Sequence, residues 1–306
     1  MTRFLISRFL QGIVVILAVF VITFVLQKLS PTSPFNGERN VPEEVRKTLE
    51  SYYGYDKPWL VQMWLHIKAF ATFNPPDCVK SPGRGVGEVI SQAFPVSVAL
   101  AVPALLIALA IGIPLGAIAA LRPNTFDDHW ATATATLGIC IPSFVLGPLI
   151  AMIFGLYLRW FNVAGWHDSA DWVLPSLTLG LIYSGYVARL TRGGLRETLA
   201  QDFIRTARAK GASEPVVVIR HALKLACLPL LNFLGPTAAG LLTGSMVTET
   251  VFQIPGLGQH FISSAINRDD TLAVGITLLF AVLILVFNML VDIIQAALNP
   301  RIGLKS

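Results

Sequence analysis

The feature that most restricts the fold is a series of long segments without charged side chains. The first, FLQGIVVILAVFVITFVL from Phe9 to Leu26, contains no Asp, Glu, Lys, Arg or His. About 20 helical residues at ~1.5 Å each cross the ~30 Å hydrocarbon layer of a bilayer. Because a helix satisfies its own backbone polar groups in lipid, such segments favour helices over open sheets. The sequence predicts an all-α integral membrane protein.

Composition supports lipid as the main surroundings. Only 13% of the 306 residues are charged, against about 25% in ordinary soluble domains. The net charge of +5 is interpreted as an orientation signal, because no basic patch alternates with stacking aromatic residues as a nucleic-acid groove requires. The first apolar run exceeds the ~7–15 residues of a signal-peptide core and lacks a small-residue cleavage site, so we expect it to remain as a span.

About six spanning helices are predicted, and two prolines, Pro142 and Pro148, favour a bend in the third. The predicted spans are Phe9 to Leu29, Ala93 to Leu121, Thr132 to Leu158, Trp172 to Leu190, Cys227 to Val251 and Leu272 to Leu298. We therefore divide the chain into an N-terminal spanning helix (1–29), an outer segment (30–92), a core of five spans (93–300) and a tail (301–306).

Charge distribution predicts the orientation. The segment from Arg189 to Lys224 carries eight basic and three acidic residues, whereas residues 30–92 carry seven of each. An excess of Lys and Arg marks cytoplasmic loops, so the loop 193–226 is predicted to be cytoplasmic and six spans place both termini on that side. The outer segment contains two amphipathic stretches, VPEEVRKTLESYYG and WLVQMWLHIKAF, expected either on the outer face of the bundle or in the membrane interface.

The basic loop has its own local pattern. Asp202 to Lys210 reads as a short helix that ends at Gly211, where a left-handed residue is favoured. Ser213 stands where it can cap a second helix, and Pro215 is tolerated in that helix's first turn. A rigid pair of short helices could dock another protein, but an ordinary solvated loop would show the same charge excess.

Family resemblance adds to this reading. FIRTARAKGASEPVVVIRHALKLACLP resembles the cytoplasmic loop of binding-protein-dependent ABC importer permeases, where a Glu-Ala-Ala-x₃-Gly motif fits a groove of the ATPase subunit. Ala207 and Gly211 match this motif, whereas Arg205 and Thr206 replace its Glu and first Ala. TGSMVTETVFQIPGLGQHF and GICIPSFVLGPLIAMIF also resemble the oligopeptide, dipeptide and nickel branch, most closely the first permease subunit of oligopeptide importers.

The resemblance implies a type I ABC importer permease fold and ATP-driven import of oligopeptides across a bacterial inner membrane. The implied partners are a homologous sister permease, two ATPase subunits or domains that bind ATP and Mg²⁺, a periplasmic peptide-binding protein and membrane lipid. The residues implied to couple to the ATPase are Arg205, Thr206, Ala207, Lys210, Gly211, Ala212, Ser213 and Glu214. Dipeptides, nickel chelates or glutathione-like compounds are alternative cargoes, and a stand-alone secondary transporter is the alternative mechanism.

One ionisable residue, Glu249, lies with Thr248 near the end of the fifth span. It is predicted either to face the translocation path or to sit among headgroups. The resemblance places Pro255, Gly256 and Gly258 in an outer gate. The chain has no H-E-x-x-H, paired-cysteine or G-x-x-x-x-G-K-[ST] motif, so no catalytic, metal or cofactor site of its own is expected.

Overall fold

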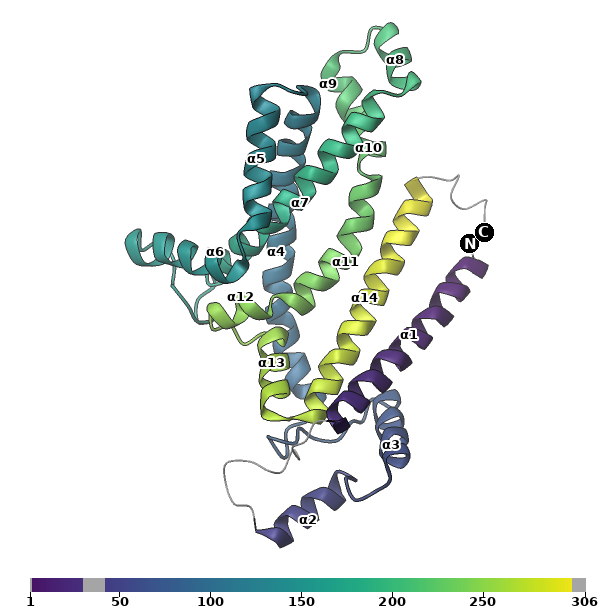
Figure 1. The fold of residues 1–306 in the computed structure, drawn as a ribbon, viewed down its shortest axis with the longest axis vertical. Helices are drawn as coiled ribbons and strands as arrows, with labels where there is room; N and C mark the ends of the chain where they lie inside the picture. The colour runs from purple at the N-terminus through teal and green to yellow at the C-terminus, as the bar shows by residue number, and fades with distance from the viewer. Residues whose placement is uncertain (1, 30–41, 299–306) are drawn as a thin grey trace. The chain divides into compact units, whose positions relative to one another are not determined.

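The computed structural model describes residues 2–29 and 42–298 and divides the chain into two compact units. Unit 1 comprises residues 1–96 and 256–285, and unit 2 comprises residues 97–255 and 286–306. Two helices, α4 (Val86–Leu121) and α14 (Asp270–Leu298), contribute residues to both units. The described chain is almost entirely helical (Figure 1), which confirms the predicted all-α class.

Unit 1 contains the first span and the segment that follows it. Its helices are α1 (Thr2–Leu29), α2 (Glu43–Tyr52), α3 (Trp59–Ala71), α13 (Leu257–Asn267) and the first parts of α4 and α14. Helices α2 and α3 coincide with the two stretches that were predicted to be amphipathic. Helix α2 begins after Pro42 and is followed by Gly54, which has a positive φ of 73°.

Two apolar clusters and one acidic corner hold unit 1 together. Phe20 and Phe24 of α1 pack with Val274 and with α3, and a second cluster joins the start of α4 to α14. Between α13 and α14, Asp269 accepts hydrogen bonds from the backbone N–H groups of Val79 and Lys80 at 3.0 and 3.1 Å. These bonds fix the turn before α4 to the start of α14.

Unit 2 is organised around α7 (Val173–Leu199). Its other helices are α5 (Phe126–Cys140), α6 (Ser143–Ile150), the π-helix η1 (Ala151–Tyr157), α8 (Asp202–Ala209), α9 (Glu214–Val216), the π-helix η2 (Val217–Ala222), α10 (Leu223–Ala226), α11 (Leu228–Gly244) and α12 (Met246–Val251). Small residues let α7 approach its neighbours closely. A Cβ added to Gly112 would lie 2.6 Å from Ser184 O, and one added to Gly185 would collide with Ala135 O.

The third predicted span is not a single straight helix. Its two parts, Phe126–Cys140 and Ser143–Tyr157, are bent by 102°, and Figure 1 shows α6 leaving the end of α5 almost at a right angle. The break falls at Ile141, which is extended (φ −82°, ψ 116°), because a following proline disfavours the helical region. Pro142 thus produces the predicted bend, whereas α6 continues through Pro148.

Other boundaries also differ from the sequence prediction. Helices α4 and α7 are longer than expected, and the fifth span is interrupted at Ser245 between α11 and α12. After the N-cap residue Gly256, the chain forms the 11-residue helix α13. Five of the described helices are long and apolar enough to cross a membrane, and the bent α5–α6 pair makes six when counted as one span.

Candidate functional site

The basic loop forms the two short helices that the sequence predicted. They are joined by residues 210–213, which contain Gly211 and are called the corner below. Helix α8 ends at Ala209, Gly211 adopts a left-handed φ of 85°, and α9 begins at Glu214. In Figure 1, α8 lies beyond the ends of α7 and α9, at one extremity of unit 2. Ser213 occupies the N-cap position, but its side chain makes no capping hydrogen bond, so its expected capping role is wrong.

An apolar anchor fixes α8 to the rest of unit 2. Ile204 is fully buried and packs in a cluster with Leu195 of α7 and with Val217, Val218, Ala222 and Ala226. Beneath this cluster α7 meets α10 so closely that a Cβ on Gly194 would collide with the carbonyl oxygen of Ala226. Because protein interiors are densely packed and resist compression, we expect the corner to move together with α7 and α10.

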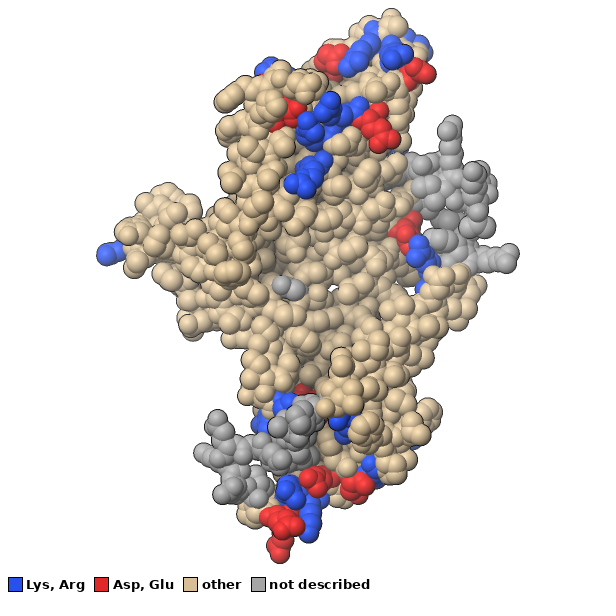
Figure 2. All heavy atoms as spheres, in the orientation of Figure 1, with Lys and Arg blue, Asp and Glu red and all other residues tan. Residues whose placement is uncertain are grey.

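The outer face of the corner is polar and charged. Arg208 spans the glycine turn, donating from Nε and Nη2 to the two carboxylate oxygens of Glu214 at 2.7 and 3.1 Å. This pairing lowers the pKa of Glu214 and raises that of Arg208. Figure 2 shows basic and acidic side chains gathered over the end of unit 2 that carries α8. The pair holds the two sides of the corner together from outside while the apolar cluster holds them from inside.

The eight residues predicted for coupling divide between two environments. Ala207 and Ala212 pack partly against the apolar cluster, and Ala212 N donates to Ala207 O at 3.2 Å. The residues that face outward are Arg205, Thr206, Lys210, Gly211, Ser213 and Glu214. The sequence prediction missed three exposed apolar side chains beside them, Phe203, Val216 and Ile219. Apolar positions on the polar face of a short helix were the signal that could have identified them.

The helix after the corner is wound differently from an ordinary α-helix. Residues Val217–Ala222 form a π-turn between α9 and α10. Its consecutive residues Val217 and Val218 are both buried, so both contribute to the cluster around Ile204. Such π-turns occur frequently at functional sites.

A buried ion pair joins α5 to α7 within unit 2. Arg192 Nε and Nη2 donate to Asp128 Oδ1 and Oδ2 at 2.7 and 2.9 Å. Asn124 N also donates to Asp128 Oδ2 at 3.0 Å. The sequence prediction missed this pair because it began the third span at Thr132 and left Asp128 outside. An ionisable residue within an apolar helix was the available signal.

Glu249 is fully buried in unit 2. Ser97 Oγ of α4 and Ser245 Oγ each donate to Glu249 Oε1, at 3.0 and 2.6 Å. The neighbouring Thr248 is also buried, and Pro255 is exposed. Gly256 and Gly258 belong to unit 1, as the N-cap and second residue of α13. The role of these five residues in a path or gate stays a prediction.

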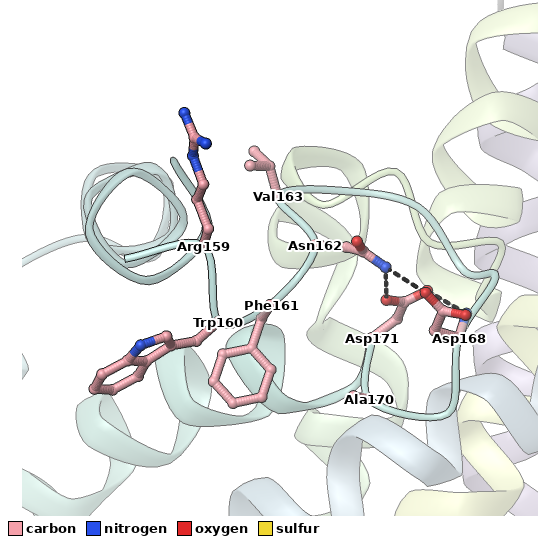
Figure 3. A pocket seen from close by; sticks show the side chains of 9 residues that line it. Arg159, Trp160, Phe161, Asn162, Val163, Asp168, Ala170 and Asp171 are labelled. Atoms are coloured by element: carbon pink, nitrogen blue, oxygen red, sulfur yellow. Dashed lines mark hydrogen bonds between the residues drawn. The ribbon is translucent and has the colours of Figure 1, made fainter. Parts of the chain in front are cut away.

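The loop between η1 and α7 surrounds a cavity of about 370 Å³ (Figure 3). Asp171 organises this loop by accepting hydrogen bonds from the backbone N–H groups of His167 and Asp168 and from Asn162 Nδ2, at 2.6 to 2.8 Å. Figure 3 shows the Arg159, Trp160 and Phe161 side chains directed away from this polar cluster, so the cavity presents no converging set of groups. Within residues 2–29 and 42–298, no cluster of His, Cys, Asp and Glu could hold a metal ion.

Comparison with known proteins gives concordant matches. A model described as "binding-protein-dependent transport system inner membrane component" matches residues 112–304, and the model of its N-terminal region matches residues 1–101. A dipeptide transport system permease protein of Bacillus subtilis is 41% identical over 304 residues, and an oligopeptide transport system permease protein of Escherichia coli is 39% identical; each match covers 99% of both chains.

Solved structures share the fold. An inward-facing MetNI methionine ABC transporter matches with a TM-score of 0.59 at 19% identity, covering 69% of this chain and 96% of that chain. An amino acid ABC transporter matches with a TM-score of 0.52 at 18% identity, covering 68% and 94% of the two chains.

Proposed function

This chain belongs to the family of binding-protein-dependent transport system inner membrane components, and we propose that it is the permease subunit through which an ATP-driven importer moves short peptides into the cell. It is a multi-pass membrane protein with the type I ABC importer permease fold. Relatives named for dipeptide and oligopeptide transport match at equal coverage, which supports peptides as the cargo class.

The observation that carries the coupling part of the proposal is the construction of the α8 corner. Ile204 anchors the corner to α7 and α10 from inside, while Arg205, Lys210 and the exposed Ile219 remain available outside. Interfaces combine apolar anchors with charged residues that select the partner. A displacement applied to α8 by an ATPase subunit therefore reaches the spanning part of unit 2 through α7.

The remaining partners follow from the same proposal. A homologous sister permease supplies the other half of the pathway, and a periplasmic peptide-binding protein delivers the cargo. ATP and Mg²⁺ bind to the two ATPase subunits, so this chain performs no covalent chemistry. The proposed orientation places α8 and both termini in the cytoplasm, in agreement with the excess of Lys and Arg around α8.

Transport in a reconstituted system tests the function. The full complex is placed in liposomes with the binding protein outside, and uptake of labelled peptides of two to five residues is measured with and without ATP. We expect uptake only with ATP and with the binding protein. Uptake that follows an ion gradient without ATP would show a secondary transporter instead.

The docking role of α8 needs a separate test. Arg205→Glu reverses a charge on the exposed face of α8, and Lys47→Glu makes the same change on α2 of unit 1, where Lys47 is also exposed. We expect Arg205→Glu to reduce recovery of the ATPase subunits with the purified permease at least fivefold and Lys47→Glu to leave it unchanged. Equal recovery for both variants would exclude α8 as the docking site.

A further inference from the structure

Helix α3 of unit 1 has two apolar faces, and only one of them is covered by protein. On the covered face, Met63, Ile67 and Phe70 pack against Phe20 and Phe24 of α1. The His66 ring also approaches the Phe24 ring, with 5.9 Å between the ring centroids. Helix α3 therefore lies alongside the first membrane span.

The other face of α3 is exposed although its residues are large and apolar. Leu60 is 75% exposed and Trp64 is 64% exposed, and Val61 and Leu65 are exposed on the same side. Just after the helix, Phe73 is 95% exposed. A helix facing water usually presents polar residues there, and a contiguous exposed apolar surface indicates an interaction site.

The contacts of α1 give the depth of α3 in the membrane. The first polar side chains after the apolar run of α1 are those of Gln27 and Lys28. Gln27 Nε2 donates to Asp270 O at 3.1 Å, and Lys28 Nζ lies 3.7 Å from the centre of the Tyr55 ring. At ~1.5 Å per residue, Phe24 and Phe20 are about 6 and about 12 Å deeper than Lys28 along α1. A helix in contact with both phenylalanines lies below this polar boundary.

The charges around α3 also suit a lipid surface. Helix α3 contains no Asp or Glu, and its exposed face carries one cation, Lys68; Lys57 precedes the helix. Tryptophan is enriched at membrane interfaces, and lysine stems reach from there to the headgroups. Helix α2 is different, with Glu43, Glu44, Arg46, Lys47 and Glu50 within ten residues.

We propose that α3 is an interfacial membrane anchor, whose Leu60–Trp64 face lies among the lipids at the boundary between headgroups and acyl chains. On α1, the apolar residues Val25, Leu26 and Leu29 are also exposed, near the end where α3 packs on Phe24. Its partner is the lipid bilayer. The anchor holds α3 at the membrane surface independently of any cargo.

Collision accessibility of a spin label tests the anchor in the assembled complex. Nitroxide labels are attached at Leu60→Cys and Trp64→Cys, with Lys47→Cys on α2 as the control, after Cys140 and Cys227 are replaced by Ala. In lipid nanodiscs we expect oxygen to relax the labels at 60 and 64 more than a water-soluble nickel chelate does, and the reverse at 47. Dominance of the nickel chelate at 60 and 64 would overturn the proposal, and so would shielding from both reagents, which indicates a protein cover.

A second measurement, quenching of tryptophan fluorescence by brominated lipids, requires no label attached to α3. The chain has six tryptophans, so the fluorescence of Trp64 is obtained as the difference between the emission of the unmodified protein and that of Trp64→Phe. We expect phosphatidylcholine brominated near the top of the acyl chain to quench the Trp64 component at least twice as strongly as phosphatidylcholine brominated near the chain end. A Trp64 component that neither lipid quenches would overturn the assignment. Both readouts are independent of transport, so they distinguish failure of the anchor from failure of the proposed function.

Discussion

Arg192 holds Asp128 through two hydrogen bonds of 2.7 and 2.9 Å, one from Nε and one from Nη2. The Asp128 side chain is only 2% exposed, whereas that of Arg192 is 29% exposed. The adjacent pair of Arg122 and Asp127 offers a natural comparison, because its side chains are 70% and 38% exposed. The two ion pairs, formed by the consecutive residues Asp127 and Asp128, thus differ mainly in how far their side chains are buried.

Breaking the buried pair is expected to destabilise the protein more than breaking the exposed one. Asp128→Ala leaves the Arg192 guanidinium without its partner, and such a change costs about 3 kcal/mol, at the lower end of the usual range because Arg192 is partly exposed. Asp127→Ala, the matched control, costs about 0–1 kcal/mol. Denaturant unfolding of the purified protein in detergent measures both, and equal losses would contradict the assigned importance of the buried pair.

The backbone of Gly211 is predicted to be needed for coupling. Gly211 has a φ of 85° and no neighbouring atom within 4 Å of an added Cβ, so within this chain a substitution acts through the backbone alone. A β-branched residue in the left-handed backbone conformation costs about 1–2 kcal/mol, whereas Asn adopts this conformation more readily. We expect Gly211→Val to lower ATP-dependent peptide uptake at least fivefold while ATP hydrolysis continues, and Gly211→Asn to retain most uptake. Unchanged uptake in Gly211→Val would refute the role of the corner.

The buried carboxylate of Glu249 is predicted to hold α12 against α4. Glu249→Ala leaves the Ser97 and Ser245 hydroxyls without their acceptor, and each unsatisfied buried group costs about 1–3 kcal/mol. Glu249→Gln retains an acceptor oxygen and serves as the control. We expect a thermal unfolding midpoint several degrees lower for the alanine variant than for the glutamine variant. A midpoint for Glu249→Ala equal to that of the unmodified protein would be inconsistent with this contact.

His66 is predicted to make unit 1 sensitive to acid. Burial against α1, together with the nearby charge of Lys28, lowers its pKa to about 4, and its Nδ1 atom is buried without a hydrogen-bond partner in the described part of the chain. Between pH 6.5 and pH 4 the unfolded chain binds a proton that the folded protein excludes. Stability therefore falls as the pH is lowered through this window, by at most about 1.4 kcal/mol per pH unit.

The variant His66→Gln isolates this effect, because Gln does not titrate. We expect the difference in unfolding midpoint between pH 7.5 and pH 4.5 to be smaller in His66→Gln than in the unmodified protein. Identical pH dependence in the two proteins would show that His66 is not excluded from protonation by folding.

The parts of the structure that the sequence predicted are those governed by local patterns. The uncharged run of α1, the proline before α2 and the glycine after α8 act within a few residues, so their consequences could be inferred directly. The contacts of Asp128 with Arg192 and of Glu249 with Ser97 join residues 64 and 152 positions apart. No local pattern specifies which helices meet, and these two contacts were therefore missed.

The bent segment formed by α6 and η1 has a consequence for assembly. From Trp130 to Leu158 the chain contains no Asp, Glu, Lys, Arg or His, so neighbours of α6 and η1 meet a surface without ionic groups. Their association should therefore be nearly indifferent to added salt and should respond to temperature and to the thickness and fluidity of the surrounding lipid.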